Sequence, residues 1–332
     1  MSSTNRPRVV VAIISWNRVA EVCTCINSVA SVAYPNYELL VVDNASRDAT
    51  VATVRERFPH VTVLRNERNL GYAGGSNVAF RYALDRGADY VLLLNQDVRV
   101  APDLIDRLVE AAESDSRIAI AGAKNRLMDN PAYTWGRYGI LNWGPMLVYT
   151  RGRYERDYDE PGITDVDWVI GNGCLLRCAT LREIGPFDEE FFHFNEDVDW
   201  CTRARRASRR VVYVDQAALD HHGSSSADEA EEVASTSGYF LGRTCILFAS
   251  KHASAWQWLR LLVNMVVGLG LRLAWHTVGA VNYAIRIQWP FVEGMIDGFS
   301  GRLQRDKITI RRQSSAPVVE RRFHHFLNWI GV

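Results

Sequence analysis

Apolar and polar positions alternate regularly along the first part of the chain. Almost wholly apolar runs of strand length, each ending in polar residues, lie at residues 8–16, 37–46, 61–66 and 88–98. Between them, apolar residues recur at helical spacing at residues 19–32, 48–57 and 78–86, and Pro102 is expected to start one more helix. Strands that alternate with helices are typical of a parallel sheet covered by helices. The pattern therefore predicts an α/β protein with a Rossmann-like, mostly parallel central sheet flanked by helices.

The second part of the chain has a looser pattern. Residues 132–149 are rich in glycine and aromatic residues and are expected to form loops. Residues 167–177 are strand-like, a helix is expected after Asn195, and residues 209–215 form a further apolar run that ends near two adjacent histidines. These elements continue the α/β pattern to about residue 225.

Polar side chains follow the predicted strands where each one ends. Because the carboxyl ends of parallel strands share one edge of a sheet, and ligands bind at that edge, we expect these residues to line one site. Asp43 is placed to accept hydrogen bonds from a base or a ribose, and the glycine-rich loop 69–77 would let a ligand approach the backbone. The loop matches neither the dinucleotide pattern nor the P-loop pattern. The candidate donor-binding residues are Ser15, Asn17, Arg18, Asp43, Asn44, Ser46, Asn69, Gly71, Gly75, Asn77, Asn95 and Gln96.

A divalent metal is the second expectation at this edge. Asp97 follows an apolar strand, and hard cations bind carboxylate and diphosphate oxygens together, which makes Mg²⁺ or Mn²⁺ the candidate ion. His221 or His222, at the end of the later strand, could supply a second ligand whose ring is fixed by a neighbour. The plainer alternative is a strand-end aspartate in a turn and a pair of exposed histidines.

Three carboxylates, those of Glu196, Asp197 and Asp199, stand beside aromatic residues in the stretch FFHFNEDVDW. Burying an unpaired carboxylate costs several kcal/mol, so the stretch suggests a general base held in an apolar pocket. The alternative is a capped helix, in which Asn195 is the N-cap, the acids favour the helix dipole and Asp199 pairs with Arg203. Burial would raise the pKa of such a base, whereas helix-start amides and arginines would lower it.

Charge and hydropathy set the C-terminal part of the chain apart. The net charge is zero over 332 residues, but from Lys251 onward eleven Lys or Arg stand against four Asp or Glu. Residues 256–289 place their polar side chains on one side of a helical wheel, and their longest uncharged run, 261–271, is too short to span a bilayer. An amphipathic, basic helix suits a membrane surface, while packing in the fold or in a dimer is the alternative.

The remaining composition limits the class of protein. Hydrophobic residues make up 48% of the chain, which is ordinary for a globular protein with an ample core. The six cysteines are scattered without zinc-ligand spacing and predict reduced thiols. The apolar run at 9–14 is too short for a secretory signal, so we expect a cytoplasmic protein.

The motifs together resemble those of the family 2 glycosyltransferases with the GT-A fold, and most closely the bacterial rhamnosyltransferase-like branch. The resemblance covers about residues 8–225, with the motifs in family order. They read ISWNR, VVDNAS, NLGYAGGSN, LLLNQDV, GNGCLLR, IGPFDEEFFHFNEDVDWCTRAR and HHGSSS. The family pattern before the metal ligand is N-P-D or D-x-D. Here Asn95 and Gln96 depart from it, and Asp97 is the matched acid.

The resemblance implies an inverting, metal-dependent transferase with Asp197 as the base and Glu196 orienting the acceptor. It implies a dTDP- or UDP-sugar donor, with dTDP-rhamnose as the candidate, and a glycan or lipid-linked acceptor in cell-surface polysaccharide synthesis, with no nucleic acid as partner. Gly171, Asn172, Gly173 and Trp200 are expected on the acceptor side. Two rivals are a non-catalytic nucleotide-sugar binder on the same fold and a nucleotidyltransferase, although the latter would need a basic, glycine-rich loop after the first strand.

The resemblance also gives a domain plan. Residues 1–130 are the expected nucleotide-sugar half and residues 131–250 the acceptor and catalytic half of one GT-A domain. Residues 251–332 are the amphipathic, basic region, which would place a cytoplasmic enzyme against the inner face of the plasma membrane if it binds lipid. The sequence does not predict the oligomeric state.

Overall fold

The computed structural model describes residues 6–143, 147–160, 162–222, 227–275 and 281–304. Its strands are β1 Val9–Ser15, β2 Tyr37–Asp43, β3 Thr62–Arg65, β4 Tyr90–Asn95, β5 Val98–Val100, β6 Ile118–Leu127, β7 Asn130–Gly136, β8 Gly139–Leu141, β9 Val148–Thr150, β10 Ile163–Asp165, β11 Cys174–Arg177 and β12 Arg210–His221. Its helices are α1 Val19–Val29, α2 Thr50–Arg57, α3 Gly71–Asp85, α4 Leu104–Ser114, α5 Cys178–Ile184, α6 Glu196–Arg206, α7 Ala227–His252, α8 Ala255–Trp275 and α9 Val281–Ser300.

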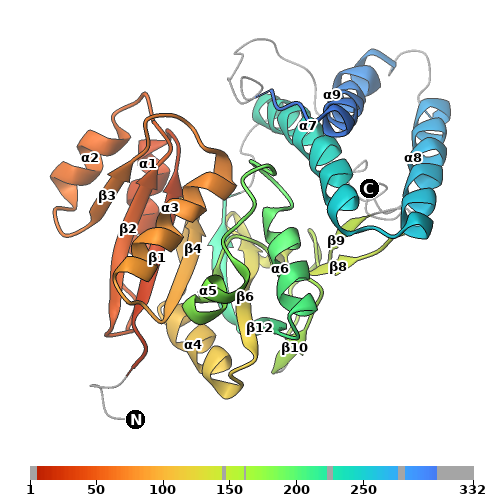
Figure 1. The fold of residues 1–332 in the computed structure, drawn as a ribbon. Helices are drawn as coiled ribbons and strands as arrows, with labels where there is room; N and C mark the ends of the chain where they lie inside the picture. Colours follow the sequence, from red (N-terminus) through yellow and green to blue (C-terminus); the bar gives the residue numbers. More distant parts are fainter. Residues whose placement is uncertain (1–5, 144–146, 161, 223–226, 276–280, 305–332) are drawn as a thin grey trace. The chain divides into compact units, whose positions relative to one another are not determined.

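Contacts between residues divide the chain into two compact units. The first comprises Met1–Ile140, Thr150–Phe192 and Glu196–Gly223, and contains the large sheet with helices α1 to α6 (Figure 1). The second comprises Leu141–Tyr149, His193–Asn195 and Ser224–Val332, and contains helices α7 to α9.

The sheet of the first unit is mixed, with a block of four parallel strands at one end of its strand order. Its strands follow the order β10-β12-β6-β11-β4-β1-β2-β3, with β5 paired to β12 and β7 paired to β6. Strands β4, β1, β2 and β3 are parallel neighbours, whereas β11 runs antiparallel between β4 and β6. The register sets Ser15 opposite Asp43 and Ile14 opposite Asn95, so the carboxyl ends of β1, β2 and β4 lie at one edge. The predicted fold class is thus confirmed.

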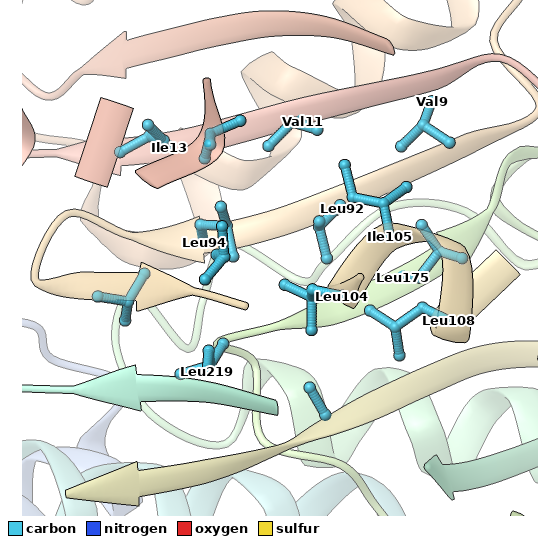
Figure 2. Close-up of a cluster of buried hydrophobic side chains, with 14 of the residues drawn as sticks. Val9, Val11, Ile13, Leu92, Leu94, Leu104, Ile105, Leu108, Leu175 and Leu219 are labelled. Atoms are coloured by element: carbon cyan, nitrogen blue, oxygen red, sulfur yellow. The ribbon is translucent and has the colours of Figure 1, made fainter. Parts of the chain in front are cut away.

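The main core lies between one face of the sheet and helices α1 and α4. Alternate residues of β1 and β4 point into it, and the apolar side of α4 packs on them (Figure 2). The opposite face of the same strands is buried as well, because α3 contacts β1, β2 and β4 there. Burial on both faces explains why these strands read as continuous apolar runs. The residues labelled in Figure 2 are Val9, Val11, Ile13, Leu92, Leu94, Leu104, Ile105, Leu108, Leu175 and Leu219.

The glycine-rich segment 69–77 differs from its prediction. It was expected to be a loop before a helix at 78–86, but α3 already begins at Gly71. A Cβ atom on Gly75 would lie 2.9 Å from the amide nitrogen of Asn44 and 3.0 Å from Ile14. The glycines therefore serve close packing of the first turns of α3 on the sheet, which outweighs their low helix propensity.

The aromatic stretch 132–149 also differs, because it contains most of β7 together with β8 and β9 rather than loops alone. Strand β7 pairs with β6 and makes one isolated bridge from Tyr133 to Arg156, and residues 130–133 at its start are exposed. An exposed edge strand needs no apolar alternation and tolerates Pro131, so the periodicity gave no strand signal.

The second unit is built on a close crossing of α7 and α9. A Cβ atom on Gly242 would collide with the Phe291 carbonyl oxygen, and one on Gly294 with the Tyr239 carbonyl oxygen. The predicted amphipathic region forms a pair of helices, α8 and α9. Within the described parts of the chain, no helix combines the length and the hydropathy that crossing a bilayer requires.

Candidate active site

The ends of β1 and β2 carry buried polar side chains. The Asp43 side chain is fully buried, and its Oδ2 accepts a hydrogen bond from the Ser46 backbone at 3.0 Å. Its Oδ1 and the Ser15 hydroxyl are buried without a hydrogen-bond partner among the described residues. Asn17, with a left-handed φ of 57°, donates its N–H to the Ser46 hydroxyl at 2.7 Å. The turns therefore hold an acceptor and a hydroxyl ready for a polar ligand.

The predicted asparagines in and beside the glycine-rich segment form hydrogen bonds within the protein. The Asn69 side chain accepts the Gly71 N–H at 2.8 Å, and the Asn44 amide donates to the Gly71 carbonyl at 2.9 Å. Asn77 is buried and forms hydrogen bonds with both the N–H and the carbonyl of Phe187. Asn44, Asn69 and Asn77 thus fix the start of α3.

The predicted metal ligands come together at the carboxyl edge. His221 Nε2 lies 3.4 Å from Asp97 Oδ1, while His222 donates its backbone N–H to the Asp97 carbonyl at 2.9 Å. The imidazole of His221, not that of His222, therefore faces the carboxylate. The Trp135 ring packs against His221 edge-on, with centroids 4.8 Å apart. Burial acts to raise the pKa of Asp97, but the adjacent His221 and the charge of Arg18 outweigh it, and the pKa falls below its ordinary value.

This pair fits a hard cation in part. A carboxylate oxygen and an imidazole nitrogen are suitable donors for Mn²⁺ or Mg²⁺, and diphosphate oxygens and water could complete the set. In the described ranges, no group of three or more His, Cys, Asp or Glu side chains forms a complete protein site. A metal at this position would need ligands from the substrate.

Asn95 and Gln96, which precede Asp97, form hydrogen bonds with other residues at the carboxyl edge of the sheet. The Asn95 N–H donates to Asn172 Oδ1 at 2.9 Å. The Gln96 side chain accepts from the Trp16 N–H at 2.9 Å and donates to the Trp16 carbonyl at 3.2 Å. The Gln96 side chain therefore ties the ends of β1 and β4 together.

The acidic stretch begins α6, as predicted, and its three carboxylates have different surroundings. Asp199 is ion-paired with Arg203 at 2.8 Å, which confirms the expected pairing one turn apart. Glu196 is buried, and its Oε2 has no hydrogen-bond partner within the described part of the chain. Burial, and then the charges of Asp197 and Asp199, raise the pKa of Glu196 well above its usual value, which favours its neutral form.

Asp197 is held by backbone donors. Its Oδ2 accepts the Gly171 N–H at 2.8 Å and its Oδ1 accepts the Val198 N–H at 2.8 Å. Burial raises the pKa of Asp197 to about 6, and these backbone hydrogen bonds limit the rise. The group is mostly ionised at pH 7 yet close enough to neutrality to take up a proton, which is the condition for a general base.

Hydrogen bonds connect the Asp197 carboxylate to the end of β4, close to Asp97 in the sequence. Gly171, bonded to Asp197, precedes Asn172, whose side chain accepts from the Asn95 N–H at the end of β4. Asp97 stands two residues beyond Asn95. Asp197 and Asp97 therefore lie along the same edge of the sheet, close to the Asp43 end.

Trp200, predicted on the acceptor side, and Asn195, the predicted N-cap of α6, both have other contacts. Trp200 is fully buried and its indole N–H donates to the Gly185 carbonyl at 2.9 Å, so it belongs to the core and an acceptor cannot reach it. Asn195 has a left-handed φ of 65° and its side-chain amide donates to the Thr244 hydroxyl at 2.9 Å, within the second unit. The Asn195 amide is therefore engaged with α7 rather than with the start of α6.

Sequence reasoning missed Tyr72 and Trp135. Tyr72 donates its hydroxyl to the Gly171 carbonyl at 2.7 Å, and Trp135 packs on His221. A tyrosine inside a glycine-rich segment was a usable signal for the first. For Trp135 no signal existed, because its contact depends on the pairing of β7 with β6.

Comparison with known proteins defines the class. The fold resembles that of a mannosyltransferase from Pyrobaculum calidifontis solved in complex with GDP-Man and Mn²⁺, with a TM-score of 0.55 and 15% identity over 90% of this chain and 88% of that one. This likeness shows the GT-A-like fold. Together with the sequence relatives, it makes the protein a glycosyltransferase.

Sequence relatives give the family. The model for glycosyl transferase family 2 matches residues 10–172. An N-acetylglucosaminyl-diphospho-decaprenol L-rhamnosyltransferase of Mycobacterium tuberculosis is 30% identical over 238 residues, covering 66% of this chain and 76% of the relative. A dTDP-rhamnosyl transferase of Shigella flexneri is 26% identical over 170 residues, covering 52% and 54%. The chain belongs to glycosyl transferase family 2.

Proposed function

We propose that this protein is an inverting, metal-dependent glycosyltransferase that uses a nucleotide-sugar donor and Asp197 as its general base. The observation that carries the proposal is the state of Asp197, which is fixed by the Gly171 and Val198 N–H groups and has a pKa raised to about 6. A carboxylate in this state can accept the proton of an acceptor hydroxyl as it attacks the sugar. A non-catalytic binder on the same fold would not need it.

The residues of the edge divide the remaining tasks. Asp43 Oδ1 and the Ser15 hydroxyl would bind the nucleoside, because at the ends of β1 and β2 both are buried without a hydrogen-bond partner among the described residues. Asp97 and His221 would hold Mn²⁺ or Mg²⁺. When bound, such an ion stabilises the negative charge of the departing diphosphate. Glu196, whose raised pKa favours the protonated form, would orient the acceptor by donating a hydrogen bond.

The relatives indicate the substrates. Two named rhamnosyltransferases, one of them acting on a decaprenol-linked sugar, are similar to this chain over at least half its length. We therefore propose rhamnose from dTDP-rhamnose as the transferred sugar and a lipid-linked glycan as the acceptor. In this plan residues 1–130 bind the donor, residues 131–250 supply the base and acceptor surface, and residues 251–332 meet the membrane.

A panel of nucleotide sugars tests the donor and the metal together. Thermal stabilisation is measured with dTDP-, UDP- and GDP-sugars, each with and without Mn²⁺ or Mg²⁺. We expect dTDP-rhamnose with a metal to give the largest shift, and transfer of labelled rhamnose to a lipid-linked acceptor to follow. Stabilisation by none of the donors, with no transfer, would contradict the proposal.

Peripheral membrane association is the second part of the proposal. Exposed apolar side chains gather on α8, where Val266 is 72% and Trp256 66% exposed. Arg260 is exposed on the same helix, and the chain from Lys251 onward carries its surplus of basic residues. Apolar insertion next to basic charge favours an anionic lipid surface. The other exposed apolar residues of α8 are Leu259, Leu262, Val263 and Val267.

Co-sedimentation with vesicles of phosphatidylcholine and phosphatidylglycerol tests this association. Val266→Glu is expected to weaken binding severalfold, because it puts a charge on the apolar face. Gln257→Glu adds the same charge at a half-buried position of α8 and is the matched control, expected to bind almost as the unmodified chain does. Equal binding by all three proteins would refute the membrane role of α8.

A further inference from the structure

Most polar groups of the segment Gly171–Gly173 are hydrogen-bonded to other residues of the protein. Gly173 donates its N–H to the Leu93 carbonyl at 2.9 Å and accepts from the Ala123 N–H at 2.9 Å. The Asn172 side chain accepts from the Asn95 N–H and donates to Asn125 Oδ1 at 3.0 Å. Few groups of this segment are left for an acceptor, although the sequence suggested that role.

Gly171 is anchored on both sides of its Cα atom. Its N–H donates to Asp197 Oδ2 at 2.8 Å. Its carbonyl, in the next peptide plane, accepts the Tyr72 hydroxyl at 2.7 Å and the Cys174 thiol at 3.1 Å. Because φ and ψ of a glycine are both soft, an N–H on a glycine is held in place only when its neighbouring peptide plane is held as well. The bonds to the Gly171 carbonyl fix that second plane and the position of its Cα atom, which limits how far the N–H can swing from the carboxylate.

Glycine is the residue that the local space allows here. A Cβ atom at position 171 would lie 3.1 Å from Asp197 Oδ2 and 3.4 Å from Tyr72 Cε1, so a side chain would press on the carboxylate. The position therefore combines a residue of high backbone freedom with external groups that remove that freedom.

We propose that Tyr72 and the segment Gly171–Gly173 form a positioning bridge that fixes Asp197 relative to the end of β4, with Tyr72 as a positioning residue for the base. The inference rests on the proposed function of Asp197. One end of the bridge is the Asn172 bond to Asn95, beside the proposed diphosphate position, and the other is the Gly171 bond to Asp197. Tyr72 lies in the first turn of α3, so the start of this helix also positions the base.

Tyr72→Phe tests the bridge, with Tyr82→Phe as the matched control. Both tyrosines lie on α3, and the Tyr82 hydroxyl donates to Glu38, which is at the start of β2 and away from the carboxyl edge. Tyr72→Phe is expected to lower kcat roughly tenfold, the effect of about one hydrogen bond, with the donor KM within about twofold. Its acidic pH limb should move to higher pH, because a less well-aimed N–H stabilises the ionised base less. Tyr82→Phe should leave kcat and the limb unchanged.

Gly171→Ala provides a second test, because its added methyl group displaces the carboxylate. It should lower kcat more than Tyr72→Phe does, while binding of dTDP with Mn²⁺ stays within about twofold. Normal kcat and an unmoved limb in Tyr72→Phe would overturn the inference. Failure of the proposed function looks different: the unmodified enzyme would show no transfer, or Asp197→Asn would keep full activity.

Discussion

Two parts of the carboxyl edge differ in whether their buried polar groups have hydrogen-bond partners. At the ends of β1 and β2, Ser15 Oγ and Asp43 Oδ1 are buried with no hydrogen-bond partner in the described chain. In the segment Gly171–Gly173, the corresponding groups are bonded to Asp197, Tyr72 and neighbouring strands. An unsatisfied buried polar group costs about 1–3 kcal/mol, so a protein retains one chiefly where a ligand will meet it. The contrast separates residues that await a ligand from residues that hold the site together.

The same contrast separates the two acids that begin α6. Glu196 has a buried oxygen without a partner and a pKa raised well above normal, whereas Asp197 has backbone donors on both oxygens. Neighbouring carboxylates with different surroundings can take different roles, one as a neutral donor and one as a base.

Removal of the base has the largest expected effect. Asp197→Asn should lower kcat about 100- to 10,000-fold, because a positioned base contributes that much, while donor affinity stays near that of the unmodified enzyme. Steady-state kinetics and a calorimetric titration with dTDP and Mn²⁺ measure the two quantities. Asp199→Asn, which changes an acid two positions on, is the control and should reduce kcat far less. A fully active Asp197→Asn enzyme would erase the distinction between the two acids.

Asp43→Asn tests the ligand-facing part of the edge. An amide in place of the carboxylate turns one acceptor into a donor, so donor KM should rise about tenfold or more with a smaller change in kcat. Asp48→Asn is the control, because the Asp48 carboxylate accepts hydrogen bonds from the N–H and the hydroxyl of Thr50 at the start of α2. An unchanged donor KM in Asp43→Asn would show that the unpartnered oxygen does not mark a ligand contact.

Stability should change in the direction opposite to activity. The pKa of Asp197 in the folded protein, about 6, lies above that of an ordinary aspartate, so the folded state binds the proton more tightly. The free energy of unfolding of the unmodified protein should therefore decrease as pH rises from about 4 through 6. In Asp197→Asn this side chain does not titrate, so the free energy of unfolding should not fall over this pH range. Thermal unfolding should therefore show a Tm a few degrees higher than that of the unmodified protein at pH 8. Near pH 4 the difference should shrink, and a Tm gap independent of pH would contradict the assignment.

Trp200→Phe should have the smallest effect on activity. The indole is in the core, and the change removes its hydrogen bond to the Gly185 carbonyl and some packing. We expect Tm to fall by a few degrees and the acceptor KM to stay within about twofold. A large rise in the acceptor KM with an unchanged Tm would restore Trp200 to the acceptor site.

The sequence predicted the central strands well because they are buried on both faces. The runs ending at Ser15, Asp43 and Asn95 became β1, β2 and β4, and their polar ends meet at one edge as expected. Helix α6 also begins where the acidic stretch indicated. Local patterns sufficed for these elements because burial and periodicity act within a few residues.

The same patterns failed where distant parts of the chain decide the structure. Gly74 and Gly75 were predicted to lie in a loop, because their spacing does not show the close packing of α3 that requires glycine there. Trp200 was expected on the acceptor side, but it is buried and its indole N–H donates to the Gly185 carbonyl, a contact that spacing cannot show. The Gly171–Gly173 segment read as an acceptor surface, because its bonds to Asp197 and Asn95 cannot be inferred from spacing.

The pH dependence of kcat/KM tests most directly whether Asp197 is the base, since this ratio reports groups of the free enzyme. For the unmodified enzyme we predict an acidic limb with an apparent pKa near 6, the value that burial gives Asp197. The residual activity of Asp197→Asn should lack this limb. A rate that stays level down to pH 4.5, or a limb that survives in Asp197→Asn, would contradict the account.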